Sequence, residues 1–225
     1  MHAMTKRGML IISVWVVVLL SVGSQLASAQ EMPHPFALAV KSAVLIDANS
    51  GEFLYGQNPD ERLSPASFVK LMTLFLTFDA IDQGQVLIDD KVWISEKAWR
   101  AGGSKMFVRQ GDRVPLEELI KGIAVVSGND ACIAVAEFLQ GNEQAFVAKM
   151  NQKAQELKLE NTQFQTVNGW PARDQYTSAR DMAIIARAYL QAHPQAIKYH
   201  QLKEFTHENI RQKKSQWPSL ARSHS

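Results

Sequence analysis

Two short apolar stretches separated by a turn form the first recognisable pattern in the chain. Residues 42–47 (Ser-Ala-Val-Leu-Ile-Asp) lead through the turn residues 49–51 (Asn-Ser-Gly) into residues 52–55 (Glu-Phe-Leu-Tyr). Glycine readily adopts the positive φ angles of tight turns, so this order predicts a β-hairpin. A smaller second hairpin is predicted over residues 108–114, around Gly111.

Longer stretches repeat apolar residues at intervals of three and four, the spacing that places them on one face of a helix. In the first stretch Phe68, Leu71 and Phe75 follow Ser67, where the predicted helix begins. Further helices are predicted over residues 115–126, 131–139, 143–157 and 178–192, with a loop at 168–171. No good strand is found after residue 195, although an isolated hairpin is only marginally stable and needs further strands. The pattern predicts an α+β protein.

Composition and charge exclude several classes of function. The 225 residues suffice for one domain with a sizeable core, and 24 Lys and Arg stand against 22 Asp and Glu. Two of the basic residues precede residue 30, where there is no acid, so the remainder has 22 of each sign. A neutral chain without a basic stripe is not expected to bind nucleic acid. The single cysteine excludes an intrachain disulfide, and six scattered histidines predict neither a metal nor another cofactor.

Residues 1–29 have the pattern of an export signal. Lys6 and Arg7 precede an apolar run at residues 9–22, and the small-x-small sequence Ala-Ser-Ala follows at 27–29. The alternative is a membrane anchor, but the run is shorter than the ~20 residues that span a bilayer. The protein is therefore expected outside the cytoplasm, in the periplasm or at the outer face of the cytoplasmic membrane.

Ser67 and Lys70 are separated by one turn of the first predicted helix. Residues three apart share a helix face, so the hydroxyl and the amine can come within hydrogen-bonding distance. A neutral lysine can accept the hydroxyl proton and make the serine a nucleophile, provided that the lysine pKa lies well below its usual value of about 10.4. Backbone N–H groups at the helix start can also stabilise an oxyanion. The alternative is a helix cap followed by a solvated lysine, and the spacing alone does not separate the two.

A second polar motif, Ser127-Gly128-Asn129, interrupts two strongly apolar helical segments. Polar groups in such surroundings are expected to have partners. The Ser127 hydroxyl can relay a proton, and the Asn129 amide can both donate to and accept from a peptide backbone. The alternative is a helix–helix turn in which Asn129 is a cap. The two motifs together are more specific than either alone.

Together these motifs resemble those of the low-molecular-weight D-alanyl-D-alanine carboxypeptidases, penicillin-binding serine enzymes of peptidase family S11. The resemblance extends from about residue 43 to about residue 211. Segments that match the family in order are 64–73 (Ser-Pro-Ala-Ser-Phe-Val-Lys-Leu-Met-Thr), 103–107 (Gly-Ser-Lys-Met-Phe), 127–131 (Ser-Gly-Asn-Asp-Ala) and 176–182 (Tyr-Thr-Ser-Ala-Arg-Asp-Met).

The resemblance implies a β-lactamase/DD-peptidase-like fold, in which a helical cluster packs against an antiparallel sheet, with residues 30–212 forming part of the catalytic domain. It implies that Ser67 forms the acyl-enzyme and that Lys70 is the general base. Ser127 would pass a proton to the leaving group, and Asn129 would hold the substrate peptide. The implied substrate is a peptidoglycan stem peptide ending in D-Ala-D-Ala, and β-lactam antibiotics are expected to acylate the same serine.

One part of the family pattern is missing. The family's third motif, Lys-Thr-Gly, is absent because no glycine follows Gly169, and residues 214–216 (Lys-Ser-Gln) come nearest to it. Residues 213–225 are unpatterned and polar, which we interpret as a truncated or frame-shifted end that lacks the family's later strands. An incomplete sheet would leave an open strand edge and exposed apolar helix surface, so low stability and little activity are expected.

Two other functions remain open. A β-lactamase shares the Ser67 and Lys70 spacing, but it usually has Asp in the middle of the second triplet, where Gly128 stands here. It also needs an additional carboxylate to activate water. The other alternative is a non-catalytic remnant that associates with the cell wall and shares only the ancestry of the enzymes.

Overall fold

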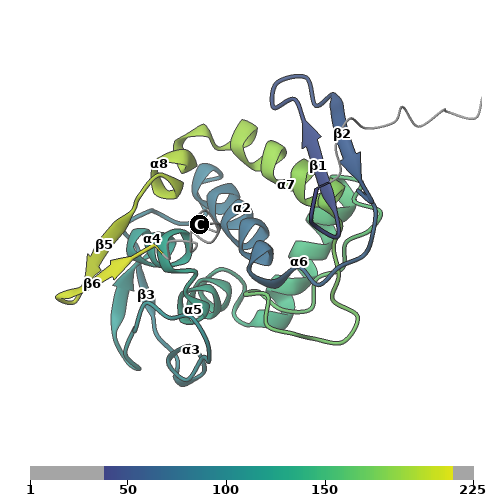
Figure 1. The fold of residues 1–225 in the computed structure, drawn as a ribbon. Coiled ribbons are helices and arrows are strands. Elements are labelled where there is room, and N and C mark those ends of the chain that lie inside the picture. The colour runs from purple at the N-terminus through teal and green to yellow at the C-terminus, as the bar shows by residue number, and fades with distance from the viewer. Residues whose placement is uncertain (1–37, 215–225) are drawn as a thin grey trace, which may run out of the picture. The chain divides into compact units, whose positions relative to one another are not determined.

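The computed structural model describes residues 38–214, whose elements are labelled in Figure 1. The longer helices are α2 (Val69–Asp82), α4 (Leu116–Val126), α5 (Asn129–Gln140), α6 (Glu143–Glu156) and α7 (Ala179–Ala192). The shorter ones are α3 (Glu96–Trp99), α8 (Ile197–His200) and the 3-10 turns η1 (Ala66–Phe68) and η2 (Pro194–Ala196). The five helices predicted from apolar spacing are confirmed. The predicted signal peptide and residues 215–225 of the predicted tail lie outside the described residues.

The strands of the described residues form three separate two-stranded antiparallel sheets. They are β1 (Ala43–Ile46) with β2 (Phe53–Gln57), β3 (Lys91–Trp93) with β4 (Arg113–Pro115), and β5 (Glu204–His207) with β6 (Ile210–Lys213). The first predicted hairpin is confirmed, with Leu45 opposite Tyr55. The combination of a helical cluster with small antiparallel sheets confirms the α+β class.

Two strand predictions are wrong. Residues 108–114 do not pair with one another, because β4 pairs with β3 and places Val114 opposite Val92. A pairing between segments some 20 residues apart leaves no local signal in the sequence. The prediction of no strand after residue 195 is also wrong, since β5 and β6 form a hairpin there. The polar sequence of β6 (Ile-Arg-Gln-Lys) lacks the apolar alternation by which strands are recognised.

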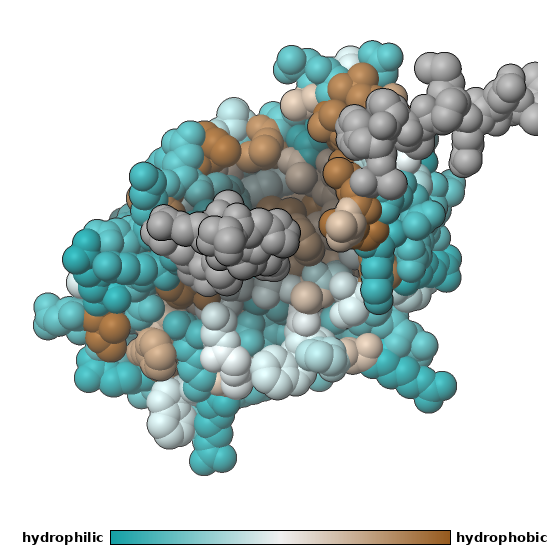
Figure 2. All heavy atoms as spheres, viewed as in Figure 1, coloured by the Kyte–Doolittle hydropathy of each residue, from teal (hydrophilic) through white to brown (hydrophobic). Residues whose placement is uncertain are grey.

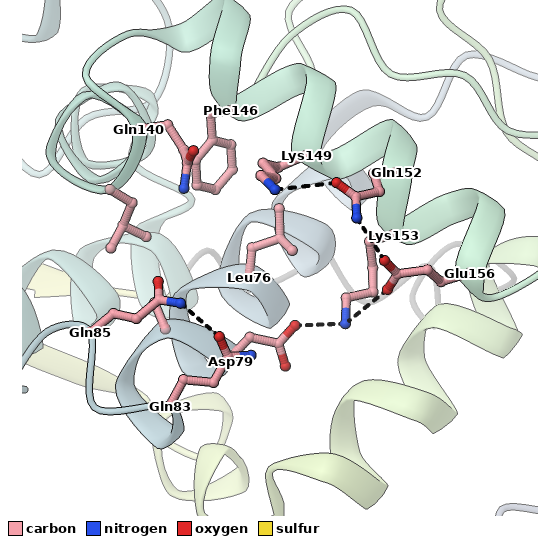
Figure 3. Close-up of a pocket in the computed structure, with 12 residues that line it drawn as sticks. Leu76, Asp79, Gln83, Gln85, Gln140, Phe146, Lys149, Gln152, Lys153 and Glu156 are labelled. Atoms are coloured by element: carbon pink, nitrogen blue, oxygen red, sulfur yellow. Dashed lines mark hydrogen bonds and ion pairs between the residues drawn. The ribbon is translucent and has the colours of Figure 1, made fainter.

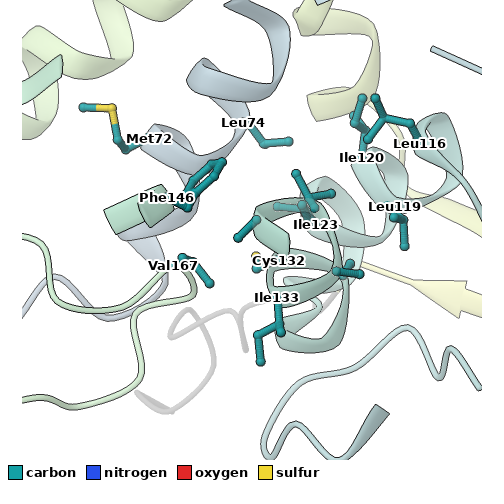
Figure 4. Close-up of a cluster of buried hydrophobic side chains, with 14 of the residues drawn as sticks. Met72, Leu74, Leu116, Leu119, Ile120, Ile123, Cys132, Ile133, Phe146 and Val167 are labelled. Carbon is teal, nitrogen blue, oxygen red and sulfur yellow. The ribbon is translucent and has the colours of Figure 1, made fainter. Parts of the chain in front are cut away.

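Helix α2 lies at the centre of the core and contacts α4, α5, α6 and α7 (Figure 1). Its side chains Met72 and Leu74 belong to the buried cluster of Figure 4, together with Ile123 of α4, Cys132 of α5 and Phe146 of α6. Burying a large aliphatic or aromatic side chain contributes about 1.5–3 kcal/mol, so this cluster fixes the position of α2. Within residues 38–214 no helix has both the length and the apolar character to cross a membrane.

The hairpin β1–β2 is held on α7. Ser178 caps this helix by accepting a hydrogen bond of 3.1 Å from the backbone N–H of Asp181. Further along α7, Arg187 donates to the carbonyl oxygens of Ala48 (3.0 Å) and Asn49 (2.6 Å) in the hairpin turn. Figure 2 shows apolar residues gathered around this hairpin, beside a hollow in the surface.

Candidate active site

Ser67 lies in the 3-10 turn η1, immediately before α2. The residue is exposed, whereas Pro65 in front of it is buried. Between them, Ala66 has a φ of 45°, in the left-handed region that residues other than glycine rarely adopt. Such a conformation costs on the order of 1–3 kcal/mol and persists only where the surroundings impose it. The chain thus holds an accessible hydroxyl on a strained and well-supported turn.

Lys70 follows one turn later, at the buried start of α2. Its Nζ lies 3.2 Å from Ser67 Oγ and 2.6 Å from the backbone carbonyl oxygen of Asn168. Only 5% of the residue is exposed. Burial lowers the pKa of the Lys70 amine below its usual 10.5, and the nearby thiol of Cys132 opposes this shift in part. The amine is therefore biased toward the neutral form that can accept the Ser67 proton.

The loop at residues 166–170 supports this pair from the other side. Thr73 of α2 donates a hydrogen bond of 2.6 Å to the carbonyl oxygen of Val167. Gly169 has a φ of +83° and runs so close to η1 that a Cβ atom on it would lie 1.8 Å from the carbonyl oxygen of Ala66. Only glycine fits both the conformation and the contact. The sequence predicts a loop here, but its contact with the Ser67 turn is long-range and leaves no local pattern.

Ser127 ends α4 in a left-handed conformation, with a φ of 57°. It lines one cavity of about 500 Å³ together with Ser67 and Lys70. Its Oγ is buried and has no hydrogen-bond partner among the described residues. Buried hydroxyls are rarely left unpaired, so this one is available to a ligand or to a proton in transfer. The structure therefore brings Ser67, Lys70 and Ser127 to the same place, as the two motifs predict.

Asn129 lies apart from that cavity, although it follows Ser127 by only two residues. Its Nδ2 donates to the carbonyl oxygen of Gly102, and its backbone N–H donates to that of Ser104, both at 2.7 Å. The residue is 6% exposed and does not line the cavity. Asn129 therefore ties a neighbouring loop to α5, and its predicted role in holding the substrate peptide stays a prediction.

Asp130 also supports the site, although it belongs to neither polar motif. The carboxylate is fully buried and accepts the backbone N–H groups of Met106 (3.0 Å), Phe107 (2.9 Å) and Val108 (3.3 Å). Three hydrogen bonds from consecutive backbone N–H groups to one side chain fix the loop in front of α5. An acid in the first turn of a helix is the one signal in the sequence that points to it.

Comparison with known proteins identifies the family. The family model described as D-alanyl-D-alanine carboxypeptidase, peptidase S11, matches residues 27–222. The chain belongs to this family. The D-alanyl-D-alanine carboxypeptidase DacF of Bacillus subtilis is 46% identical over 166 residues, which cover 74% of this chain and 41% of DacF. DacA of Escherichia coli, of the same name, is 44% identical over 178 residues, 76% of this chain and 44% of DacA.

Solved structures agree with the S11 assignment. Penicillin binding protein 5 from Haemophilus influenzae is 40% identical and superimposes with a TM-score of 0.78, covering 80% of this chain and 53% of that one. Penicillin binding protein 6B from Escherichia coli superimposes with a TM-score of 0.78 at 36% identity, covering 83% and 61%. The predicted DD-peptidase-like fold is confirmed. The chain spans about half the length of the curated relatives it matches.

A second cavity, of about 260 Å³, lies between α2, α5 and α6 of this S11 chain, as shown in Figure 3. Its charged groups neutralise one another: Lys153 Nζ lies 2.7 Å from Asp79 Oδ2 and 3.6 Å from Glu156 Oε2. None of the residues predicted for catalysis lines it. This cavity is therefore separate from the predicted site residues.

Proposed function

We propose that this S11 chain is a serine-type D-Ala-D-Ala carboxypeptidase that acts through an acyl-enzyme on Ser67. The observation that carries the proposal is the 3.2 Å approach of Lys70 Nζ to Ser67 Oγ, with the amine buried in the core. A serine next to a neutral amine has the general base that it needs to become a nucleophile.

In the acylation step, Ser67 Oγ attacks the carbonyl carbon of the penultimate D-alanine while Lys70 accepts the hydroxyl proton. The bond from this carbon to the nitrogen of the terminal D-alanine then breaks. The unpaired Ser127 hydroxyl passes the proton on to that nitrogen, and D-alanine leaves as the neutral amine. Water then hydrolyses the ester on Ser67 and restores the hydroxyl.

The proposed substrate is a peptidoglycan stem peptide that ends in D-Ala-D-Ala, and β-lactams are proposed to acylate the same serine. This substrate lies outside the cytoplasm, which agrees with the export pattern of residues 1–29. We therefore propose that the protein acts in the periplasm or at the outer face of the cytoplasmic membrane, where it removes terminal D-alanine from cross-linking donors.

A second candidate is a wall-associated form that binds without turnover. Labelling with a fluorescent penicillin separates the candidates. A stable label that Ser67→Ala abolishes and that the exposed neighbour variant Ser64→Ala retains supports the carboxypeptidase. Absence of any label supports the form without turnover. Rapid loss of the label by hydrolysis supports a β-lactamase.

A further inference from the structure

The loop at residues 166–170 turns two consecutive backbone carbonyl groups toward α2. The carbonyl oxygen of Val167 accepts a hydrogen bond of 2.6 Å from Thr73. The carbonyl oxygen of Asn168 accepts one of 2.6 Å from the Lys70 amine. Thr73 and Lys70 lie about one helical turn apart, so this short segment bonds α2 at two points on one face. The position of the Lys70 amine therefore depends on how firmly the loop is held.

The contact between Lys70 and Ser67 tolerates little movement. A neutral lysine amine has two N–H bonds and one lone pair, and the lone pair must face the proton that it accepts. One N–H donates to Asn168, while Nζ lies 3.2 Å from Ser67 Oγ. A general base works within about 2.6–3.2 Å of its partner, so this contact is at the upper limit. A shift of the loop by about 1 Å is enough to slow acylation roughly 100-fold.

One buried side chain, Gln175, holds the loop by four hydrogen bonds. Its Oε1 accepts the backbone N–H groups of Gln165 (3.1 Å) and Thr166 (2.9 Å) and also the Thr166 hydroxyl (3.0 Å). Its Nε2 donates to the carbonyl oxygen of Trp170 at 3.0 Å. Only 9% of Gln175 is exposed, and burial strengthens these bonds. A single amide group therefore joins the two ends of the loop.

Gln175 is itself anchored, and Thr166 extends its hold along the loop. The neighbouring residue Tyr176 pairs with Gln163 through two backbone hydrogen bonds of 2.9 and 3.1 Å. The Thr166 hydroxyl also accepts the backbone N–H of Gly169 at 3.2 Å. A chain of contacts thus leads from Gln175 through the Thr166 hydroxyl to the middle of the loop.

We infer that Gln175 is a positioning residue, which acts through this loop on the Lys70 amine. By holding the Asn168 carbonyl in place, it keeps the lone pair of that amine directed at Ser67. The inference rests on the proposed function, because the arrangement that Gln175 supports is the one that acylation needs. Gln175 does not line the cavity, so it acts without contact with the ligand.

The titration of Lys70 reports on this position without any substrate. Burial lowers the pKa of the Lys70 amine, and the thiol of Cys132 in α5 opposes this shift. Among the described residues that line the cavity, the other ionisable groups are His200 and Lys214. All three groups lie outside the loop, so a substitution in the loop leaves them in place. A carbonyl acceptor favours the ammonium form, so loss of the bond to Asn168 should lower the pKa of Lys70 further.

The test uses Gln175→Met, which removes all four hydrogen bonds at nearly constant size. The first measurement is the titration midpoint of Lys70, followed by NMR of isotope-labelled lysine and assigned with Lys70→Met. The midpoint should fall by about one pH unit, the equivalent of one hydrogen bond to a charged group. The second measurement is the rate of penicillin labelling, which should fall roughly 100-fold.

Thr166 offers a milder matched pair of variants. Thr166→Val removes the hydroxyl at nearly constant shape, so it should lower the midpoint and the rate in the same direction as Gln175→Met, but less. Thr166→Ser keeps the hydroxyl and should stay close to the unmodified protein. If Gln175→Met does not fold, this pair decides the question by the same two measurements.

Asn151→Leu is the control for a general loss of stability. The Asn151 amide also makes two backbone hydrogen bonds, to the N–H and the carbonyl oxygen of Phe164 at 2.9 Å each, but these lie outside the loop. This variant should leave the midpoint of Lys70 and the labelling rate of the folded protein unchanged.

Three outcomes overturn the inference. They are an unchanged midpoint or labelling rate in Gln175→Met, or in Thr166→Val in its place; equal behaviour of Thr166→Ser and Thr166→Val; and an equal fall of the midpoint in Asn151→Leu. If the unmodified protein is not labelled by penicillin, the proposed function fails, and the NMR titration still decides whether Gln175 positions Lys70.

Discussion

The two sides of α2 and of the turn before it are covered to very different degrees. On one side Val69, Met72 and Phe75 are buried in the main core. On the other side Phe68 is 63% exposed, and Leu71 borders three separate cavities. The buried side of α2 holds Lys70 in place, whereas Ser67 lies at the exposed side. The difference shows how one helix can hold a base rigidly and still leave its nucleophile accessible.

The uncovered side continues onto the hairpin β1–β2, where Leu45 and Leu54 are both more than half exposed. No third strand joins this hairpin within the described residues. Apolar surface left in water forgoes about 25 cal/mol per Å² of stabilisation. The low stability expected from the sequence stays a prediction, and the exposed apolar surface on this side of α2 is what it would arise from.

The largest loss of stability and activity is expected from a substitution at Gly169, where the loop packs against the Ser67 turn. Gly169→Ala places a Cβ atom 1.8 Å from the carbonyl oxygen of Ala66, so either the loop or the Ser67 turn must move. We expect a loss of unfolding free energy of about 4 kcal/mol or more, the range of severe packing defects. Misplacement of the nucleophile by about 1 Å should also slow penicillin acylation roughly 100-fold.

Gly84→Ala is the control, because Gly84 has a similar φ of +68° with nothing within 4 Å of the new Cβ. It should cost only the backbone strain of about 1–2 kcal/mol and leave acylation unchanged. Urea denaturation and the second-order labelling rate measure the two quantities. Equal losses in the two variants would show that the close contact between the loop and the turn does not support the site.

The sequence predicts the local parts of this site and misses the long-range ones. Ser67 and Lys70 are identifiable because a helical turn fixes their separation in any fold. Gly169 and Asp130 are not identifiable by the same reasoning, because their partners, Ala66 and Met106, are distant in sequence. The same distinction applies to the strands. The hairpin β1–β2 has a local turn signal, whereas β3 and β4 are distant in sequence and have none.

Two neighbouring side chains of α2, Met72 and Leu71, differ in how far they are buried. Met72→Ala removes a fully buried side chain and should cost about 2–5 kcal/mol, with a contribution from the cavity that it leaves. Leu71→Ala removes a partly exposed side chain and should cost about 1–2 kcal/mol, since less area leaves water on folding. The shift in urea midpoint at constant slope measures both. Equal costs would mean that the uncovered side is buried in solution.

The last two predictions concern pH. The first is that the rate of acylation changes by a factor of about ten per pH unit. Lys70 accepts the Ser67 proton only when its amine is neutral, and burial lowers the amine pKa below 10.5. The labelling rate should therefore rise about tenfold per pH unit below the folded-state pKa and then level off. Lys70→Arg should be slow at every pH, because a guanidinium is not deprotonated in this range. A flat profile for the unmodified protein would contradict the role of Lys70 as base.

The lowered pKa of Lys70 also determines whether the free energy of unfolding rises or falls with pH, which can be measured without any substrate. In the unfolded chain Lys70 regains its usual pKa of 10.5, so between the folded and unfolded values the unfolded chain binds more protons. The free energy of unfolding should therefore rise with pH through this window, by at most about 1.4 kcal/mol per unit for one group. Lys70→Met removes the titrating amine and should flatten this rise. If urea unfolding gave both proteins the same dependence from about pH 7 to about pH 10, the buried amine would not be the group that titrates.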